Sequence, residues 1–341
     1  MIEKRQVQNF SSSENQPLII FLSKVLDRRL NDLDWDWEFN SLGDTIFNFM
    51  VSDEKIVATQ SMLPIPFFYK NHKISTYKSE STFILKEYRG KNIFENLYEK
   101  TVDDAFSKNG ELIWGFTPAI NAWKRNFKFT VEEDVMISVS FQFNFNRCSS
   151  LKKIIKNLIF SPAILINRLK IKTTDSIQLK NSLSKEQLSS FNQDFLNKNS
   201  YAGIDLTTDF VGWRTEKNPF LRYTIVSFIS NDNVIGAAIY SIQEDTLKIS
   251  YFAMLVETDY EKGLNILLRN ALKNKELSKF SYWGNSNNST NKIIFDLFQS
   301  KKLSTSQIDP SRSLVYKFCR NKFIKSKDMF INGLWTEGIR S

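Results

Sequence analysis

The sequence predicts an α+β protein made of two tandem domains, each a mixed, mostly antiparallel sheet flanked by helices. Strand-like and helix-like hydrophobic patterns alternate along the chain. The same order of patterns then occurs a second time, which indicates an internal repeat. The length of 341 residues also suits two domains better than one.

The composition narrows the class of protein. The chain is 42% hydrophobic and 14% aromatic, which supports packed cores and argues against disorder. Its formal net charge of +9 fits an acidic substrate or a phosphate-bearing cofactor, and we do not expect nucleic acid binding from charge alone. The isolated Cys148 and Cys319 give neither a disulfide framework nor a zinc spacing, so we expect a reducing cytoplasm and no metal site. The start of the chain lacks the apolar core of a signal peptide, and no apolar run approaches the roughly 20 residues of a membrane span.

The chain opens with an expected strand over 4–10 and an expected helix that ends near residue 30. Ser13 and Gln16 have the spacing of a capping box, and Pro17 falls in the first turn. The strands predicted next are 46–51, 56–68 with breaks at Pro64 and Pro66, and 73–85.

The most informative stretch is 80–106. A strand over 81–85 runs into a basic, glycine-containing turn over 87–92, and a helix follows from Ile93. The apolar residues of that helix recur at three- and four-residue spacing: Phe94, Leu97, Tyr98, Val102, Ala105 and Phe106. A helix start offers unpaired N–H groups and a positive dipole end, and Arg89 and Lys91 add charge there. The pattern predicts a cradle for a pyrophosphate group.

Beyond this helix we expect a strand over 112–117, a short helix that begins at Asn121, and a strand over 134–146. The last of these alternates cleanly between apolar and polar residues. Asn121 fits as the N-cap of its helix.

A basic amphipathic stretch over 151–172 divides the chain. We therefore predict one domain over 1–150, a connector over 151–172 and a second domain over 173–341. Lysine and arginine interleave with isoleucine and leucine in the connector, which fits either peripheral contact with an anionic membrane or a helix buried on one side.

The second half repeats the first with one chemical difference. Ser184 and Gln187 again have capping-box spacing, and the stretch 210–214 parallels the region of Trp37. The expected strands are 176–181, 223–229, one from residue 234, 248–255 and 280–283, with a helix over 264–272. The turn over 257–263 carries three acidic residues and no Arg-Gly-Lys run. Such a turn would repel a diphosphate, so we expect only the first domain to bind a nucleotide cofactor.

Residues 88–94, Tyr-Arg-Gly-Lys-Asn-Ile-Phe, resemble the acyl-coenzyme A loop of the Gcn5-related N-acetyltransferase (GNAT) superfamily. The sequence departs from that pattern at Asn92, where a glycine is expected, and at Phe94, where a small residue is expected. Asn tolerates a left-handed backbone better than most residues. The resemblance implies two tandem acyl-CoA N-acyltransferase domains and acetyl-CoA as cosubstrate. The residues that it implies for cofactor binding are Ile84, Leu85, Arg89, Gly90, Lys91, Asn92, Ile93 and Asn121.

The resemblance also suggests catalytic groups. Direct transfer needs a base that accepts the proton of the attacking amine. Glu80 is the first candidate, because family members often carry a carboxylate on this strand; the alternative is an edge-strand glutamate in solvent. The family's usual acid is a tyrosine on the helix after the next strand, but 121–126 contains none. Lys124, Tyr88 or water could take that role.

The leading hypothesis is an N-acetyltransferase that acts on a small-molecule amine, such as an amino sugar or sugar nucleotide of surface-glycan (polysaccharide) synthesis. One alternative is an aminoacyl or peptidyl transferase resembling the Fem-type enzymes, which would use a charged tRNA. Another is a non-catalytic binding module on the same scaffold. We expect a cytoplasmic protein, with membrane contact only through 151–172, and the sequence does not predict its oligomeric state.

Overall fold

The computed structural model describes residues 2–26, 30–40, 42–142, 177–181, 183–271, 273, 277–301, 304–309, 312–319 and 324–335. The predicted connector over 151–172, and with it the proposed membrane contact, lies outside these residues. The predicted boundaries near 150 and 173 fall in the same gap and stay predictions. Within the described residues, no helix is long and apolar enough to cross a membrane.

The first sheet has the strand order β1-β2-β3-β4-β5-β15-β6, with β9 paired to β3. Only β4 and β5 run parallel within it, and the other pairs are antiparallel. Its strands are β1 (Ile2–Gln6), β2 (Ile46–Ser52), β3 (Lys55–Tyr69), β4 (His72–Ile84), β5 (Leu112–Thr117), β6 (Thr130–Glu132), β9 (Gly203–Ile204) and β15 (Ser313–Phe318).

The second sheet has the order β14-β7-β13-β12-β11-β10-β8, again with a single parallel pair, β12 and β13. Its strands are β7 (Met136–Gln142), β8 (Gln178–Lys180), β10 (Tyr223–Ser230), β11 (Asn233–Gln243), β12 (Thr246–Met254), β13 (Lys279–Asn285) and β14 (Ser304–Ile308). Read from β8, this order matches the first sheet position by position. The predicted repeat of mixed, mostly antiparallel sheets is therefore confirmed.

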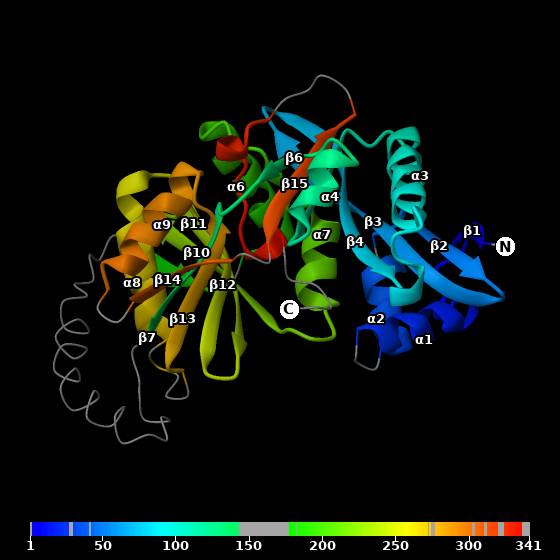
Figure 1. The fold of residues 1–341 in the computed structure, drawn as a ribbon. Coiled ribbons are helices and arrows are strands. Elements are labelled where there is room, and N and C mark those ends of the chain that lie inside the picture. The colour runs from blue at the N-terminus through cyan, green and yellow to red at the C-terminus, as the bar shows by residue number, and fades with distance from the viewer. Residues whose placement is uncertain are drawn as a thin grey trace, which may run out of the picture.

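The two halves exchange strands at equivalent positions of the two sheets. β7 follows β6 in the chain but lies between β13 and β14 of the second sheet. β15 follows β14 but lies between β5 and β6 of the first sheet. In Figure 1 the orange-red β15 accordingly crosses into the cyan part of the molecule, and the teal β7 lies beside the orange β13. Each sheet is completed by the other half of the sequence, so neither half forms its whole sheet alone.

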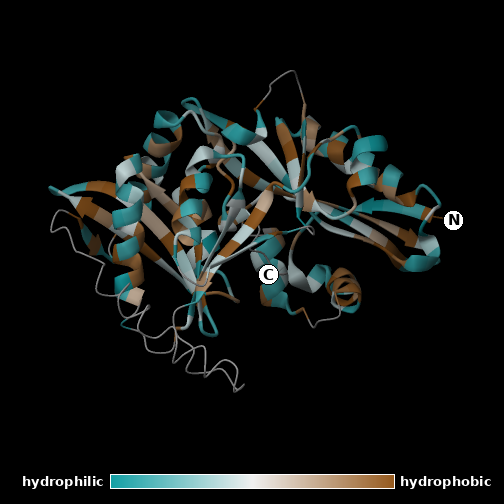
Figure 2. Cartoon of the chain, turned by 60° about the vertical axis from the view of Figure 1, so that its left-hand side comes forward, coloured by the Kyte–Doolittle hydropathy of each residue, from teal (hydrophilic) through white to brown (hydrophobic). Residues whose placement is uncertain are grey.

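Helices cover the faces of both sheets. The described helices are α1 (Gln16–Val25), α2 (Asp32–Trp35), α3 (Ile93–Ser107), α4 (Ile120–Arg125), α6 (Lys185–Lys198), α7 (Thr208–Val211), α8 (Tyr260–Ala271) and α9 (Ser289–Gln299). Both teal and brown segments occur along them in Figure 2, as expected for helices with one face on a core. The largest buried cluster draws side chains from both halves, including Trp114, Trp283 and Trp335.

Two of the predicted helix caps are wrong and one is confirmed. α1 begins at Gln16 after Asn15, whose side-chain amide donates to the carbonyls of Asn9 and Ser11 rather than capping the helix. Ser13 lies in the preceding 3₁₀ turn, so the expected capping box does not form. The N-cap of α4 is Ala119 rather than Asn121.

The confirmed cap starts α6. The Ser184 hydroxyl accepts the Gln187 N–H at 3.2 Å, and the Gln187 side chain accepts the Ser184 N–H at 3.1 Å. Pro17 also lies in the first turn of α1 as expected.

The predicted breaks at Pro64 and Pro66 do not occur, because β3 runs without interruption from Lys55 to Tyr69. Neighbouring β2 ends opposite Met62, so the prolines lie where that edge of β3 has lost its long partner strand. Proline lacks an N–H group and is tolerated where no ladder hydrogen bond is needed.

A symmetric tryptophan pair joins the halves. Trp37 and Trp213 stack with ring centroids 5.2 Å apart and an interplanar angle of 17°. The Trp37 indole N–H donates to the Trp213 carbonyl at 3.0 Å, and the Trp213 indole donates to the Trp37 carbonyl at 2.6 Å. Each residue lies in a π-helical turn, Asp36–Asn40 or Gly212–Glu216. The two stretches that the sequence indicates as repeats of each other therefore meet at the interface.

Trp213→Ala should lower the free energy of unfolding by about 3–5 kcal/mol, because it removes a buried aromatic ring and an interface hydrogen bond. Trp213→Phe keeps a ring and should cost about 1–3 kcal/mol. Equilibrium urea unfolding measures both. Phe220→Ala is the control, since that ring touches Trp37 by its edge but is 41% exposed. Equal losses for Trp213→Ala and Phe220→Ala would show that the stacked pair does not hold the halves together.

Candidate active site

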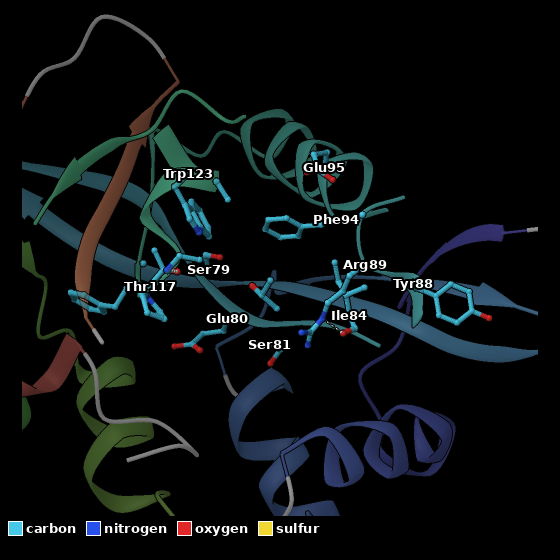
Figure 3. Close-up of a pocket in the computed structure, with 17 residues that line it drawn as sticks. Ser79, Glu80, Ser81, Ile84, Tyr88, Arg89, Phe94, Glu95, Thr117 and Trp123 are labelled. Carbon is cyan, nitrogen blue, oxygen red and sulfur yellow. Dashed lines mark hydrogen bonds between the residues drawn. The ribbon is translucent and has the colours of Figure 1, made fainter. Parts of the chain in front are cut away.

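A cavity opens where β4 and β5 separate. The strands pair for only three residues, from Thr76 opposite Leu112 to Lys78 opposite Trp114. β4 then continues to Ile84 along β3 alone, while β5 continues to Thr117 along β15. A cavity of about 570 Å³ lies between the diverging ends. Figure 3 shows it bounded by β4 below and by the starts of α3 and α4 above.

A β-bulge in β4 accompanies the separation. Ser61 pairs with Glu80 and Thr59 pairs with Phe83, so Ser81 and Thr82 together oppose Gln60. Ser81 takes a left-handed backbone, with φ of 52°. A bulge of this kind bends its strand and increases the local twist, which turns β4 away from β5.

Buried hydrogen bonds hold the bulge in place. The Gln60 side chain is fully buried, and its amide donates to the Ser79 hydroxyl at 3.1 Å and to the Glu80 carbonyl at 3.2 Å. Its carbonyl accepts the Thr82 hydroxyl at 2.5 Å. The Thr59 hydroxyl donates to the carbonyl of Ser81 at 2.9 Å. A satisfied buried network makes one backbone geometry strongly preferred.

The bulge can be tested through Ser81. Glycine adopts positive φ without a steric penalty, so Ser81→Gly should keep the free energy of unfolding within about 1 kcal/mol of wild type. Ser81→Val places a β-branched residue at positive φ and should cost about 1–3 kcal/mol. Urea unfolding measures the difference. Equal stability of the Gly and Val variants would contradict the left-handed geometry.

The turn after β4 forms the other end of the cavity. It comprises a 3₁₀ turn over Lys86–Tyr88, Gly90 with φ of +75°, and Asn92 with φ of 55° at the N-cap of α3. Asn92 makes no side-chain capping bond, so the first-turn N–H groups of α3 stay available. The departure from the family pattern at Asn92 is thus accommodated by a left-handed asparagine. Together these features make an anion site at a helix N-terminus.

The predicted cofactor residues fall into two groups. Ile84, Arg89 and Gly90 line the cavity. Leu85, Lys91, Asn92, Ile93 and Asn121 are not among its lining residues. Of these, Ile93 is buried in a small cluster under the turn, and the ammonium of Lys91 lies 5.1 Å from the Tyr88 ring centroid. Asn121 lies on α4, and the other four residues belong to the turn and the start of α3.

Glu80 lines the cavity and forms an ion pair with Lys78, with only 19% and 10% of their side chains exposed. The alternative of an edge-strand glutamate in solvent is therefore wrong. Burial lowers the pKa of Lys78, and the neighbouring Glu80 carboxylate opposes that shift. The Glu80 carboxylate, paired with the buried Lys78 ammonium, therefore lies at the end of the cavity away from the turn over 86–92.

The other two catalytic candidates lie elsewhere. Lys124 pairs with Glu133, both side chains are nearly half exposed, and neither residue lines the cavity. Tyr88 does line the cavity, but Figure 3 shows its ring at the far end from Glu80. The structure therefore brings neither group beside Glu80.

Several lining residues were not singled out in the sequence. β5 and α4 form a mostly apolar wall of the cavity, with the side chains of Phe116, Thr117, Ala122 and Trp123. Phe94, where the sequence departs from the family pattern, also lines the cavity. Its ring packs edge-on against that of Phe127, with the ring centroids 5.2 Å apart. The sequence contains a signal for Lys78, because it lies two residues from the candidate Glu80 and residues two apart on a strand share a face. Gln60 had none, because its partners come from a different strand.

The corresponding gap in the second half is filled by the chain itself. β12 and β13 pair from Thr246–Lys279 to Ile249–Tyr282 and then part. Beyond that point Gly284 forms a bridge with Asn332. Because β7 already occupies the other edge of β13, Asn332 lies on the edge that faces β12. The Asn291 side chain fixes this segment by donating to the Ile331 carbonyl at 2.8 Å.

The turn at this gap is shorter than predicted. A 3₁₀ turn covers only Glu257–Asp259, and α8 begins at Tyr260 rather than at Leu264. Gly263 lies within the helix, where a Cβ would come within 3.0 Å of the Met254 sulfur. Its role is close packing of helix on strand.

The architecture matches solved acyltransferase structures. A conserved protein of unknown function and probable N-acyltransferase from Enterococcus faecalis V583 superposes with a TM-score of 0.64 at 9% identity, over 93% of this chain and 73% of that chain. A tandem GNAT protein from the clavulanic acid biosynthesis pathway gives a TM-score of 0.59 at 8% identity, over 95% and 100%. N-myristoyltransferase from Saccharomyces cerevisiae gives 0.56 at 11% identity, over 92% and 82%.

The chain has a tandem GNAT-like fold. No protein-family model matches the sequence, and no curated protein matches it. At these identities the likeness establishes the architecture alone. The activity has to be argued from the cavity.

Proposed function

We propose that the protein is an N-acyltransferase that moves an acyl group from acyl-coenzyme A, with acetyl-CoA as the expected donor, to an amine. The observation that carries this proposal is the cavity between β4 and β5, which has an anion site at one end and the Glu80 carboxylate at the other. Acyl-coenzyme A suits a cavity with these two ends, because its diphosphate and its reactive thioester are separated along the molecule.

The cavity has the features that such a donor requires. The α3 N-terminus and Arg89 supply N–H groups and positive charge for the diphosphate. The pantetheine arm would lie along Ser81–Ile84, where β4 has parted from β5, against the apolar side chains of Phe94 and Trp123. The bound thioester supplies an activated acyl group.

Glu80 is the proposed general base. An amine attacks only when neutral, and the Glu80 carboxylate would accept its proton. Lys78 forms an ion pair with this carboxylate and fixes its position. Backbone N–H groups of the bulge would donate to the carbonyl oxygen as negative charge develops there. A thiol has a pKa of about 8.5, so the leaving thiolate needs no side-chain acid.

The nature of the acceptor beyond an amine stays a prediction. The family resemblance suggests an amino sugar or sugar nucleotide of surface-glycan synthesis. A Fem-like transferase would bind charged tRNA with strong salt dependence and would not respond to coenzyme A. A non-catalytic module would bind coenzyme A or an amine without turnover.

Arg89→Glu should weaken binding of acetyl-CoA roughly tenfold or more, because it reverses the charge beside the diphosphate site. Isothermal titration calorimetry measures this, and a rise in melting temperature with acetyl-CoA gives an independent readout. The matched control is Lys198→Glu, the same charge reversal at an exposed lysine on α6. If acetyl-CoA neither binds wild type nor shifts its melting temperature, the proposed donor is wrong.

Glu80→Gln should lower kcat by about 10²–10⁴-fold and leave acetyl-CoA affinity nearly unchanged. The rate is followed by thiol release, and circular dichroism confirms folding. Glu95→Gln is the matched control, since Glu95 lines the same cavity but is held by Asn126 near the phosphate end. Full activity of Glu80→Gln would exclude Glu80 as the base.

A further inference from the structure

The end of the cavity away from the turn over 86–92 is closed between the strands. β4 and β5 form their last pair one residue before Ser79 and Gly115. The two backbones are still close at these residues, because a Cβ added to Gly115 would lie 3.3 Å from the Cβ of Ser79. The Gln60 amide donates to the Ser79 hydroxyl at 3.1 Å and holds that side chain in place. A ligand that enters from the turn therefore cannot continue between the strands past this point.

A tryptophan closes the same end on the side of α3 and α4. Trp123 lines the cavity, although only 5% of the residue is exposed. Its indole packs edge-on against the rings of Tyr98 and Phe129, with centroids 4.6 and 5.0 Å apart. The Trp123 carbonyl also accepts the Phe129 N–H at 3.1 Å. Protein interiors are close-packed, so an indole held by these rings is a fixed wall.

Glu80 lies on the other side of β4 from this wall. Successive side chains of a strand point to opposite faces, and Ser79 directly precedes Glu80. Figure 3 shows Trp123 above β4 and Glu80 below it. The proposed base and the indole therefore border the closed end of the cavity from two opposite sides.

Acyl transfer fixes four directions at the reacting carbon. In the proposed function the sulfur arrives from the turn along 81–84, and the carbonyl oxygen faces the backbone N–H groups of the bulge. The acceptor nitrogen bonds to the carbon from the side of Glu80, which takes the proton of the amine. The carbon–sulfur bond breaks, and the thiolate leaves with its electron pair. The side of Trp123 is left for the fourth substituent, which is the remainder of the acyl group.

We propose that the indole of Trp123 limits the acyl group to a short chain, so that acetyl and propionyl groups fit and chains of about six carbons or more do not. This inference rests on the proposed function and names the donor class of that same site. The side chains behind the indole include the rings of Tyr98 and Phe129. A smaller residue at position 123 would therefore open an aromatic-lined pocket that a longer chain could fill.

The experiment compares donors that differ only in chain length. Isothermal titration calorimetry gives the Kd of wild type for acetyl-CoA and for hexanoyl-CoA, with no acceptor present. Wild type should bind hexanoyl-CoA roughly 10- to 100-fold more weakly, because its added methylene groups meet the indole. Trp123→Leu should shift this ratio of Kd values toward hexanoyl-CoA by roughly tenfold or more, since it removes the wall and leaves an apolar pocket.

The matched control is Trp35→Leu. Trp35 is 2% exposed and packs against the ring of Phe39, but it does not line the cavity. The same substitution there also removes a buried indole, so it tests whether a general loss of packing changes donor choice. It should leave the ratio of the two Kd values as in wild type.

The outcomes separate this inference from the proposed function. Equal affinity of wild type for both donors would overturn the short-chain limit and leave the acyltransferase standing. An unchanged ratio in Trp123→Leu would also overturn it, because another group would then set the limit. If circular dichroism shows that Trp123→Leu does not fold, the wild-type ratio and the smaller change Trp123→Phe still decide. Failure of wild type to bind acetyl-CoA, hexanoyl-CoA and free coenzyme A would instead overturn the proposed function, and this inference with it.

Discussion

The separation of β4 from β5 after Lys78 is the constraint on which the candidate site depends. Parallel strands normally stay paired, because each needs hydrogen-bonding partners on its edges. Here the bulge at Ser81 and Thr82 turns β4 away, and the buried amide of Gln60 satisfies the polar groups at the bulge. The freed edge of β4 then borders a cavity in place of a strand. This geometry places the turn over 86–92 and the Glu80 carboxylate at opposite ends of the same cavity.

The two halves share one architecture but use the gap between their diverging strands differently. In the first half the gap between the diverging strands is a cavity, and its turn is basic and contains Gly90 at positive φ. In the second half the gap holds Ile331 and Asn332, and its turn is acidic. The second half also contributes β15 to the first sheet and packs Trp213 against Trp37. It thus acts as a structural partner of the half that holds the cavity.

Charge is concentrated where the halves meet. Four charged side chains at this junction are largely buried: Lys78, Glu80, Glu38 and Arg214. The charge of Glu38 raises the pKa of Lys78, and the charge of Arg214 lowers it. Glu38 follows Trp37 as Arg214 follows Trp213, so the repeat places an acid and a base at equivalent positions. Buried charges are costly unless they are paired, so a cluster of them is a candidate site for binding or reaction.

The sequence by itself determined the local elements of this protein. Periods of two and near four residues indicated many of the strands and helices, the repeat and the helix that starts at Ile93, but not α9, β14 or β15. Local chemistry also gave the turn, since asparagine and glycine are the residues that accept the positive φ found at Asn92 and Gly90. Glu80 was singled out through the family resemblance, because family members often carry a carboxylate on the strand that enters this turn.

Only the tertiary structure decided which edges pair and which side chains are buried together. The exchange of β7 and β15, the filling of the second gap by Asn332 and the contact of Trp37 with Trp213 join residues far apart in the chain. Lys124 pairs with Glu133 outside the cavity, and Asn121 lies two residues after Ala119, the N-cap of its helix. Periodicity carries no information on such contacts, because it reports which face of an element is buried and not which partner covers it.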